Sequence, residues 1–248
     1  TVAAGAAVVF VIGLVSWAAF VRRAPGAGAA PVRSLAVMPL KPLAQGSNDA
    51  DVGLGLADTI ITRIGQNEGV TVRPTSAVRK YSAPDANALD AARELQVDVV
   101  LDGTLQRAGD RLRVNMTLVR VSNGATLWGK TFNTTFADVF AVEDEIATGV
   151  VSELRLSLSQ AERTRLTKHH TSSPEAYEYY LKSVATFSSV GSATANVTGN
   201  VDKGIELLER AVAIDPNYAL AHAQLAYGAM WLASINGDAV AFARAREA

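Results

Sequence analysis

The sequence predicts an α/β domain, with helices on a small mixed sheet, followed by an all-α repeat array and preceded by one transmembrane helix. Three observations predict this fold class: an uncharged apolar run at residues 2–21, strict apolar–polar alternation at residues 111–118, and purely helical signals after Ser173. The expected parts are a transmembrane helix at 2–21, a linker at 22–33, an α/β domain at 34–136, connecting helices at 137–172 and repeats at 173–248.

The apolar run VAAGAAVVFVIGLVSWAAFV at residues 2–21 is long enough to cross a bilayer core, which takes about 20 residues. Arg22 and Arg23 close the run, and Trp17 lies near that end, where aromatic rings favour the headgroup region. A cleaved signal peptide is the alternative, but it requires a preceding basic region and a shorter apolar core of about 7–15 residues. We therefore expect a single-pass anchor, in a fragment whose N-terminal neighbour precedes Thr1.

Composition excludes several classes of function. The net charge of −1 leaves no broad basic surface, so we expect no direct contact between these residues and nucleic acid. The absence of cysteine excludes disulfides and thiolate metal sites. Of the three histidines, His169 and His170 are adjacent and are expected at a solvated junction between a helix and a loop. The sequence thus predicts neither a metal site nor a cofactor.

The first half of the α/β region alternates short strands with helices. The apolar residues 34–40 predict a buried strand, and apolar positions from Leu54 to Ile64 predict a helix that ends at Gly65. Between this helix and the next part of the sheet we expect a strand at 70–72, a turn capped by Thr75 or Ser76, a helix carrying Leu89, Ala92 and Leu95, and a strand at 97–101.

The second half predicts a three-strand meander. Apolar residues from Leu112 to Leu118 alternate with polar ones, which is typical of a strand with one buried face. Asn123-Gly124 is a strong hairpin signal before the next strand, at 125–132. Asp138 is expected to cap a long helix at 139–158.

The last part of the chain repeats its helical pattern. Leu208 and Phe242 are 242 − 208 = 34 residues apart, and the same period relates Ala211 to Ala245. This is the tetratricopeptide spacing. Asp215-Pro216 would end one repeat, residues 188–200 would form a loop, and the array is expected to continue after Ala248; an unrelated antiparallel helix pair is the alternative.

No group of residues in the sequence indicates catalysis. Gly53-Leu54-Gly55 lacks the third glycine of a nucleotide-binding loop, because Asp58 occupies that place, so close helix packing is the favoured interpretation. Glu143, Asp144 and Glu145 are interpreted as a solvated helix face. Ser76, Ser82 and Ser122 have no nearby histidine in the sequence that would activate them as nucleophiles. We therefore expect no catalytic, cofactor-binding or metal-binding residues and no enzyme activity from these residues.

An ordered series of motifs resembles the TolB amino-terminal-like domain that precedes tetratricopeptide repeats in bacterial membrane-bound regulators. The motifs are SLAVMPLKPL at Ser34, GLGLADTIITRI at Gly53, VRPTSAVRKY at Val72, ARELQVDVVLDGTLQRAGDRLRV at Ala92, GATLWGKTF at Gly124 and DVFAVEDEIA at Asp138, with RLTKHHTSSPEAYEYYLK as the junction to the repeats. In similar proteins the module before the membrane span is a winged-helix DNA-binding domain, as in CadC-like transcription regulators, or a serine/threonine kinase or class III adenylate cyclase.

The resemblance implies a non-enzymatic sensory or protein-interaction region, anchored in the bacterial inner membrane with its C-terminal part in the periplasm. An assembly scaffold of the cell envelope is a further alternative. The expected partners are the membrane, through residues 2–21, a protein or peptide in a groove of the repeats, and a second copy of the chain in a homo-oligomer. By analogy the groove residues are Asn217, Tyr218, His222, Gln224 and Tyr227, although packing between helices would equally explain Tyr218 and Tyr227.

Overall fold

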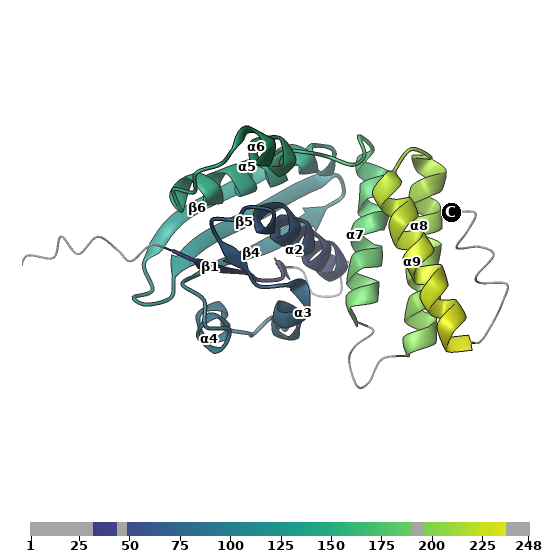
Figure 1. Cartoon of the computed structure of the whole chain (residues 1–248), viewed down its shortest axis with the longest axis horizontal. Helices are drawn as coiled ribbons and strands as arrows, with labels where there is room; N and C mark the ends of the chain where they lie inside the picture. Colours follow the sequence, from purple (N-terminus) through teal and green to yellow (C-terminus); the bar gives the residue numbers. More distant parts are fainter. Residues whose placement is uncertain (1–31, 44–48, 190–195, 237–248) are drawn as a thin grey trace, which may run out of the picture. The chain divides into compact units, whose positions relative to one another are not determined.

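The computed structural model describes residues 32–43, 49–189 and 196–236, which form a mixed α/β domain followed by helices (Figure 1). The strands are β1 (Ser34–Val37), β2 (Lys41–Pro42), β3 (Thr71–Val72), β4 (Val99–Ala108), β5 (Arg111–Arg120) and β6 (Thr126–Thr135). The α-helices are α2 (Asp49–Gly65), α3 (Thr75–Val78), α4 (Ala88–Glu94), α5 (Val139–Glu153), α6 (Gln160–Leu166), α7 (Pro174–Ser189), α8 (Val197–Ile214) and α9 (Ala219–Asn236). The predicted transmembrane run at 2–21 lies outside the described residues.

The sheet is mixed, as predicted. Its strand order is β3-β1-β4-β5-β6, with β2 also paired to β4. β1 runs parallel to β3 and β4, whereas β4, β5 and β6 form an antiparallel meander. Gly109 and Gly124 adopt positive φ angles of 59° and 70°, which glycine reaches without steric cost, at the turns that enter and leave β5.

One face of β5 contributes to the core. Leu112, Val114, Met116 and Leu118 are buried, which confirms the predicted alternation. Helices α2 and α5 contact each other above this face, while α3 and α4 lie on the side of the sheet away from α5 (Figure 1). This part of the core is thus enclosed between the meander and helices α2 and α5, and the buried residues Val78, Ala91 and Ala92 of α3 and α4 belong to the same core cluster.

The two glycines of the Gly-Leu-Gly motif lie inside α2 and permit close packing, which confirms the structural interpretation of that motif. A β-carbon at Gly53 would collide with the carbonyl oxygen of Leu40. A β-carbon at Gly55 would lie 2.6 Å from the carbonyl oxygen of Leu181, on α7. Gly55 therefore lets the backbones of α2 and α7 approach each other closely.

The helix predicted at 139–158 starts at the predicted residue but is five residues too long, because a turn and then a second helix follow α5. α5 ends at Glu153, and Arg155 turns the chain with a φ of 53°. Ser159 then starts α6 through a capping box, in which Ser159 and Glu162 each satisfy a backbone N–H of the other. The motif S-x-x-E was present in the sequence and marks this second start.

Two predicted caps are also wrong. Asp138 occupies the N-cap position of α5, but its carboxylate accepts hydrogen bonds from the Thr134 and Thr135 hydroxyls and bonds no backbone N–H of α5. Pro74 occupies the N-cap position of α3, and the Thr75 hydroxyl donates to Asp58 instead. In both cases a tertiary or turn contact competes successfully for the short polar side chain.

Helices α7, α8 and α9 pack one against the next in chain order. α7 begins at Pro174 and α8 ends before Asp215, as predicted. The loop predicted at 188–200 is wrong at both ends, because α7 reaches Ser189 and α8 starts at Val197. Phe242 and Ala245, on which the 34-residue period depends, lie outside the described residues.

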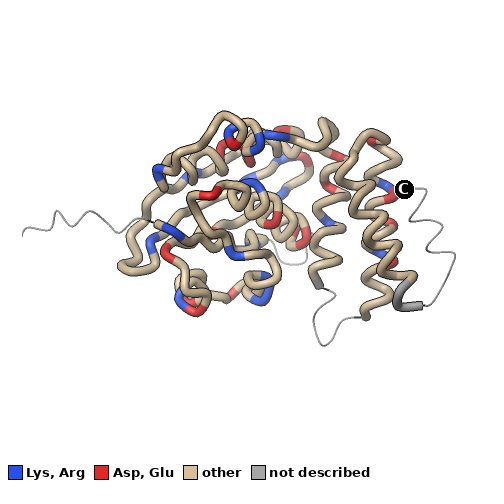
Figure 2. The backbone as a smooth tube through the Cα atoms, in the orientation of Figure 1, with Lys and Arg blue, Asp and Glu red and all other residues tan. Residues whose placement is uncertain are grey.

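Charges of both signs are interspersed along the described chain (Figure 2). Within the described ranges, no helix combines the length and the apolar character that a membrane crossing needs.

Candidate functional site

A cavity of about 200 Å³ lies where α2, α5 and the segment 165–171 meet α7 and the start of α9. Aromatic rings, basic side chains and hydroxyl groups share its lining. The lining residues are Asp58, Thr59, Thr62, Arg63, Gln66, Phe140, Arg165, Lys168, His169, His170, Thr171, Tyr177, Tyr180, Tyr218 and Leu220.

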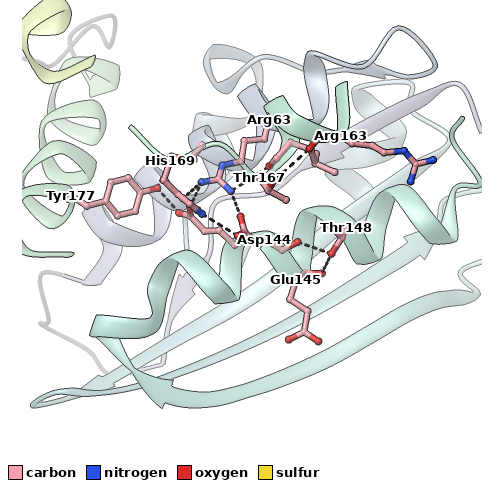
Figure 3. Close-up of polar contacts among 11 residues, drawn as sticks. Arg63, Asp144, Glu145, Thr148, Arg163, Thr167, His169 and Tyr177 are labelled. Carbon is pink, nitrogen blue, oxygen red and sulfur yellow. Dashed lines mark hydrogen bonds and ion pairs between the residues drawn. The ribbon is translucent and has the colours of Figure 1, made fainter. Parts of the chain in front are cut away.

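Beside the cavity, two ionic side chains are buried in the helix interface. Arg63 lies next to Ile64 and three residues after Ile60, on the buried side of α2, and is 8% exposed. Its Nη2 atom is 3.1 Å from Oε2 of Glu143, a residue of α5 that is 1% exposed, and its Nη1 atom is 2.7 Å from Oδ1 of Asp144. One guanidinium thus pairs with two adjacent carboxylates of another helix (Figure 3).

His169, in the segment after α6, contacts both Arg63 and Asp144. Its Nδ1 atom lies 2.8 Å from Nη2 of Arg63, and its Nε2 atom lies 3.0 Å from Oδ2 of Asp144. Because a guanidinium only donates hydrogen bonds, Nδ1 must accept. The proton of the neutral ring is therefore on Nε2, where it is donated to Asp144.

Tyr177 connects the cluster to α7. Its phenol donates to Oε1 of Glu143 and lies 3.0 Å from Oγ1 of Thr59. Its ring also begins a series of aromatic contacts along the cavity, with centroid distances of 4.9 Å to Phe140 and 6.4 Å to Tyr180, and of 5.4 Å between Tyr180 and Tyr218. The site therefore links the α/β domain to the helices that follow it.

Burial dominates the electrostatics of this cluster. It raises the pKa of Glu143 to about 7, with Asp144 adding to the effect, while Arg63 and the Tyr177 hydrogen bond oppose it. Burial and the neighbouring Glu143 raise the pKa of the Tyr177 phenol well above its ordinary value. We define the Arg63 cluster as Arg63, Glu143, Asp144, His169 and Tyr177. Its members are partners of one another, an arrangement suited to fixing helices rather than to activating a substrate.

Sequence reasoning assigned two of these groups incorrectly. Glu143 does not belong to a solvated face, although Glu145 does, where it pairs with Lys130. His169 is not merely a solvated junction, because it bonds Arg63 and Asp144. A signal for Glu143 was present, since it follows Val139 by four residues and precedes Ile146 by three, which places it in the apolar stripe of α5.

The five predicted groove residues do not form one surface. Tyr218 is 1% exposed and lines the cavity, so packing explains it better than an open groove does. Asn217 is exposed in the turn before α9, and His222 Nε2 lies 3.0 Å from the carbonyl oxygen of Pro216. Gln224 and the 58% exposed Tyr227 are three residues apart and share one side of α9, whereas His222, two residues before Gln224, lies on another.

Comparison with known proteins gives two similarities in sequence. Residues 31–149 match the family described as HilA/YgeH-like transcriptional regulator, second domain. A protein named putative adenylate cyclase 3 of Rhizobium meliloti (strain 1021) is 30% identical over 197 residues, which cover 77% of this chain. The chain spans 32% of that relative's length.

Comparison with solved structures gives matches of low TM-score to several bacterial proteins. They include PelC from Paraburkholderia phytofirmans (22% identity, 52% of this chain and 91% of that one, TM-score 0.35) and TolB from Acinetobacter baumannii (16%, 50% and 28%, TM-score 0.34). The LpoB C-terminal domain from Salmonella enterica is 18% identical over 44% of this chain and 86% of that one, with a TM-score of 0.33.

Proposed function

We propose that these residues form the non-enzymatic signal-receiving and protein-interaction region of a larger bacterial membrane-bound regulator. One observation carries the proposal: Tyr177 of α7 bonds Glu143 and Thr59 of the α/β domain, beside the close contact of Gly55 with Leu181. A partner that binds the helices with different affinity in two states of this interface would therefore change the α/β domain as well. The match to a domain of transcriptional regulators supports a regulatory role.

The proposed output module is a winged-helix DNA-binding domain located before Thr1, because the matching family is one of transcriptional regulators. A nucleotide cyclase is the second candidate, favoured by the name of the 30% identical relative. The sequence upstream of Thr1 separates the two candidates. A recognition helix followed by a β-wing supports the first, and a cyclase domain supports the second.

The decisive experiment compares two conservative variants of the full-length protein in membrane vesicles. Tyr177→Phe removes the hydroxyl that joins α7 to Glu143 and leaves the ring in place. Tyr179→Phe makes the same change on a half-buried neighbour outside the Arg63 cluster. We expect Tyr177→Phe to change promoter DNA binding, or cyclic AMP formation, severalfold and Tyr179→Phe to leave it unchanged. Equal outputs from both variants, or catalysis by residues 1–248 alone, would overturn the proposal.

We further propose that residues 2–21 span the inner membrane and that the part after Arg23 lies in the periplasm. The length of the apolar run supports the span, and the resemblance to membrane-bound regulators supports the orientation. A reporter enzyme active only outside the cytoplasm, fused after Ala248, tests the orientation. Activity of a cytoplasmic reporter at that position would contradict it.

Helices α7 to α9 are proposed to begin a tetratricopeptide array that presents a groove to a protein or peptide. The stacking of three successive helices supports this assignment. Of the predicted groove residues, Gln224 and Tyr227 share a side of α9, and Tyr227 is the more exposed. Partner retention by the full-length protein should fall for Tyr227→Ala and persist for Asn217→Ala, whose position is off that side. Retention unaffected by either change would remove these residues from the groove.

A further inference from the structure

We infer that the cavity between the α/β domain and the helices binds a small aromatic carboxylate. That such a ligand acts as the signal of the regulator rests on the proposed function, whereas its binding does not. Four properties of the cavity carry the inference: its volume, its aromatic walls, two buried phenols without partners, and the cations at its rim.

The volume sets the size of the ligand. A cavity of about 150 Å³ accommodates benzene, and drug-sized ligands occupy about 300–1,000 Å³. At about 200 Å³, this cavity matches a single ring with one or two small substituents.

The walls favour a flat ring. Phe140, Tyr177, Tyr180 and Tyr218 all line the cavity, and their successive centroid distances of 4.9, 6.4 and 5.4 Å fall in the range of aromatic pairs. A further ring placed among them would gain the same tilted or offset contacts. The walls thus select an aromatic body over a flexible aliphatic one.

Two phenols in the lining lack the partners that buried tyrosines normally have. As residues, Tyr180 is 8% exposed and Tyr218 is 1% exposed, and neither hydroxyl is hydrogen-bonded to another described residue. Neither oxygen is among the fully buried polar atoms that lack a partner, so both oxygens keep some accessible surface. The third phenol, Tyr177, is satisfied by Glu143 and Thr59. A hydroxyl or carbonyl oxygen on the inner end of a ligand would satisfy the two remaining phenols.

Charge at the rim selects an anion. Arg165 and Lys168 are exposed and line the cavity, and among the described residues neither forms a salt bridge, although Arg165 interacts electrostatically with Glu162 of the same helix. The charge of Arg63, by contrast, is matched by Glu143 and Asp144. The one opposing carboxyl group in the lining, Asp58, accepts a hydrogen bond from Thr75, and burial raises its pKa. A carboxylate therefore fits the rim, with its ring directed inward.

Calorimetric titration of residues 1–248 with 4-hydroxybenzoate tests the inference. A ligand of about ten non-hydrogen atoms should bind with a Kd near or below ~1 mM. Benzyl alcohol has a similar size without the charge and should bind at least about tenfold more weakly; benzylamine, with the opposite charge, should not bind. No saturable binding of 4-hydroxybenzoate, or equal binding of benzylamine, would overturn the inference.

Variants locate the binding. Lys168→Gln and Arg165→Gln both change exposed positions. Each should lower the affinity for 4-hydroxybenzoate by about fivefold, which is the effect of one exposed ion pair. The matched control is Arg163→Gln on the same helix α6, because the Arg163 guanidinium points away from the Arg63 cluster (Figure 3). If Arg163→Gln lowers the affinity for 4-hydroxybenzoate as much as the other two variants do, the effect comes from the loss of positive charge in general and not from contacts at the cavity rim.

A third variant tests the inner end of the site. Tyr218→Phe should weaken the binding of 4-hydroxybenzoate. It should leave the binding of benzoate unchanged, because benzoate lacks the inner hydroxyl. Equal effects on both ligands would contradict the assigned orientation. If titration fails while Tyr177→Phe still alters output, the ligand inference alone is wrong; if titration succeeds without any effect of Tyr177→Phe, the proposed function is wrong.

Discussion

Glu143 shows how a single carboxyl group can occupy a helix interface. It lies in the apolar stripe of α5, and removing a carboxylate from water is costly unless the charge is paired or neutralised. Arg63 supplies the counter-charge and Tyr177 a hydrogen bond, but burial exceeds both effects and keeps the pKa of Glu143 at about 7. Glu143 therefore changes charge near neutral pH at the contact between α5 and α7.

We predict that Glu143 makes the protein less stable as the pH rises. Between pH 4.5 and about 7 the unfolded state has released this proton and the folded state retains it. The contribution of this group to the free energy of unfolding is therefore fully present below pH 4.5 and is lost as the pH rises through 7. At ~1.4 kcal/mol per tenfold change in the ionisation constant, the loss is about 3 kcal/mol. Urea unfolding of wild type and Glu143→Gln from pH 4.5 to 8 measures it.

Glu143→Gln should remove this part of the pH dependence without unfolding the protein. The amide oxygen can face Arg63 while the amide nitrogen donates to the Tyr177 oxygen, which then donates to Thr59. The free energy of unfolding of the variant should therefore depend less on pH than that of the wild type over the same range. If the free energies of unfolding of the two proteins change with pH in parallel, Glu143 is not the source of the pH dependence.

Arg63→Met should be strongly destabilising at pH 8. It leaves ionised Glu143 buried without its cation, which typically costs about 3–5 kcal/mol. The cost should be smaller at pH 5, where the folded state holds Glu143 neutral, and smaller in the double variant Arg63→Met/Glu143→Gln. Arg93→Met, which breaks an exposed pair with Asp90, serves as the control and should change little. Denaturation midpoints that do not depend on pH would contradict the pairing.

The site was less predictable from the sequence than the fold. Arg63 and Glu143 are 80 residues apart, and no local period relates them. Each, however, interrupts an apolar stripe: Arg63 lies beside Ile64, and Glu143 lies between Val139 and Ile146. A charged residue in an apolar stripe indicates a buried charge, and buried charges are usually paired. Which charges meet depends on helix packing, and that information is not local.

At the scale of elements, the contact between α2 and α7 depends on a missing side chain. Gly55→Ala should destabilise the protein by about 1–3 kcal/mol, because its β-carbon would meet the Leu181 backbone at 2.6–2.8 Å. This loss exceeds the gain of up to ~1 kcal/mol in helix propensity. Gly65→Ala, at the end of the same helix, is the matched control, because its nearest atom would be 3.8 Å away. Thermal unfolding of both variants should show a lowered Tm for Gly55→Ala only.

Elements with strong local patterns were predictable, whereas boundaries set by tertiary contacts were not. The alternation in β5 and the glycine turns beside it follow directly from chain chemistry. The break between α5 and α6 instead depends on the positive φ of Arg155 and on the capping box of Ser159, which a continuous apolar pattern concealed. The caps expected at Asp138 and Thr75 failed because other polar partners were nearer.

For the molecule as a whole, one core continues from the sheet into the helices. Buried residues of β4, α2 and α5 form one cluster with Ala176 and Leu181 of α7 and with Leu208 of α8. A smaller separate cluster is formed by Val201 and Ile205 on α8, packed by side chains of α9. The boundary of the α/β domain in the sequence is therefore not a boundary in the packing, since α7 belongs to both parts.

This shared core predicts how the protein opens. Amide hydrogens in α7 should exchange at the same free energy as those in α2 and β4, because separating α7 would expose Leu181, Tyr177 and the carboxyl partners of Arg63 together. Amides in the outer half of α9 should exchange at a lower free energy, since Tyr227 and Met230 on that helix are exposed. Hydrogen exchange followed by mass spectrometry, at a pH where reclosing is faster than the intrinsic chemical exchange of the amides, measures all three segments at once. If α7 instead exchanges with α9, well before α2, the helices form an independent unit, and binding to them would not be transmitted to the α/β domain.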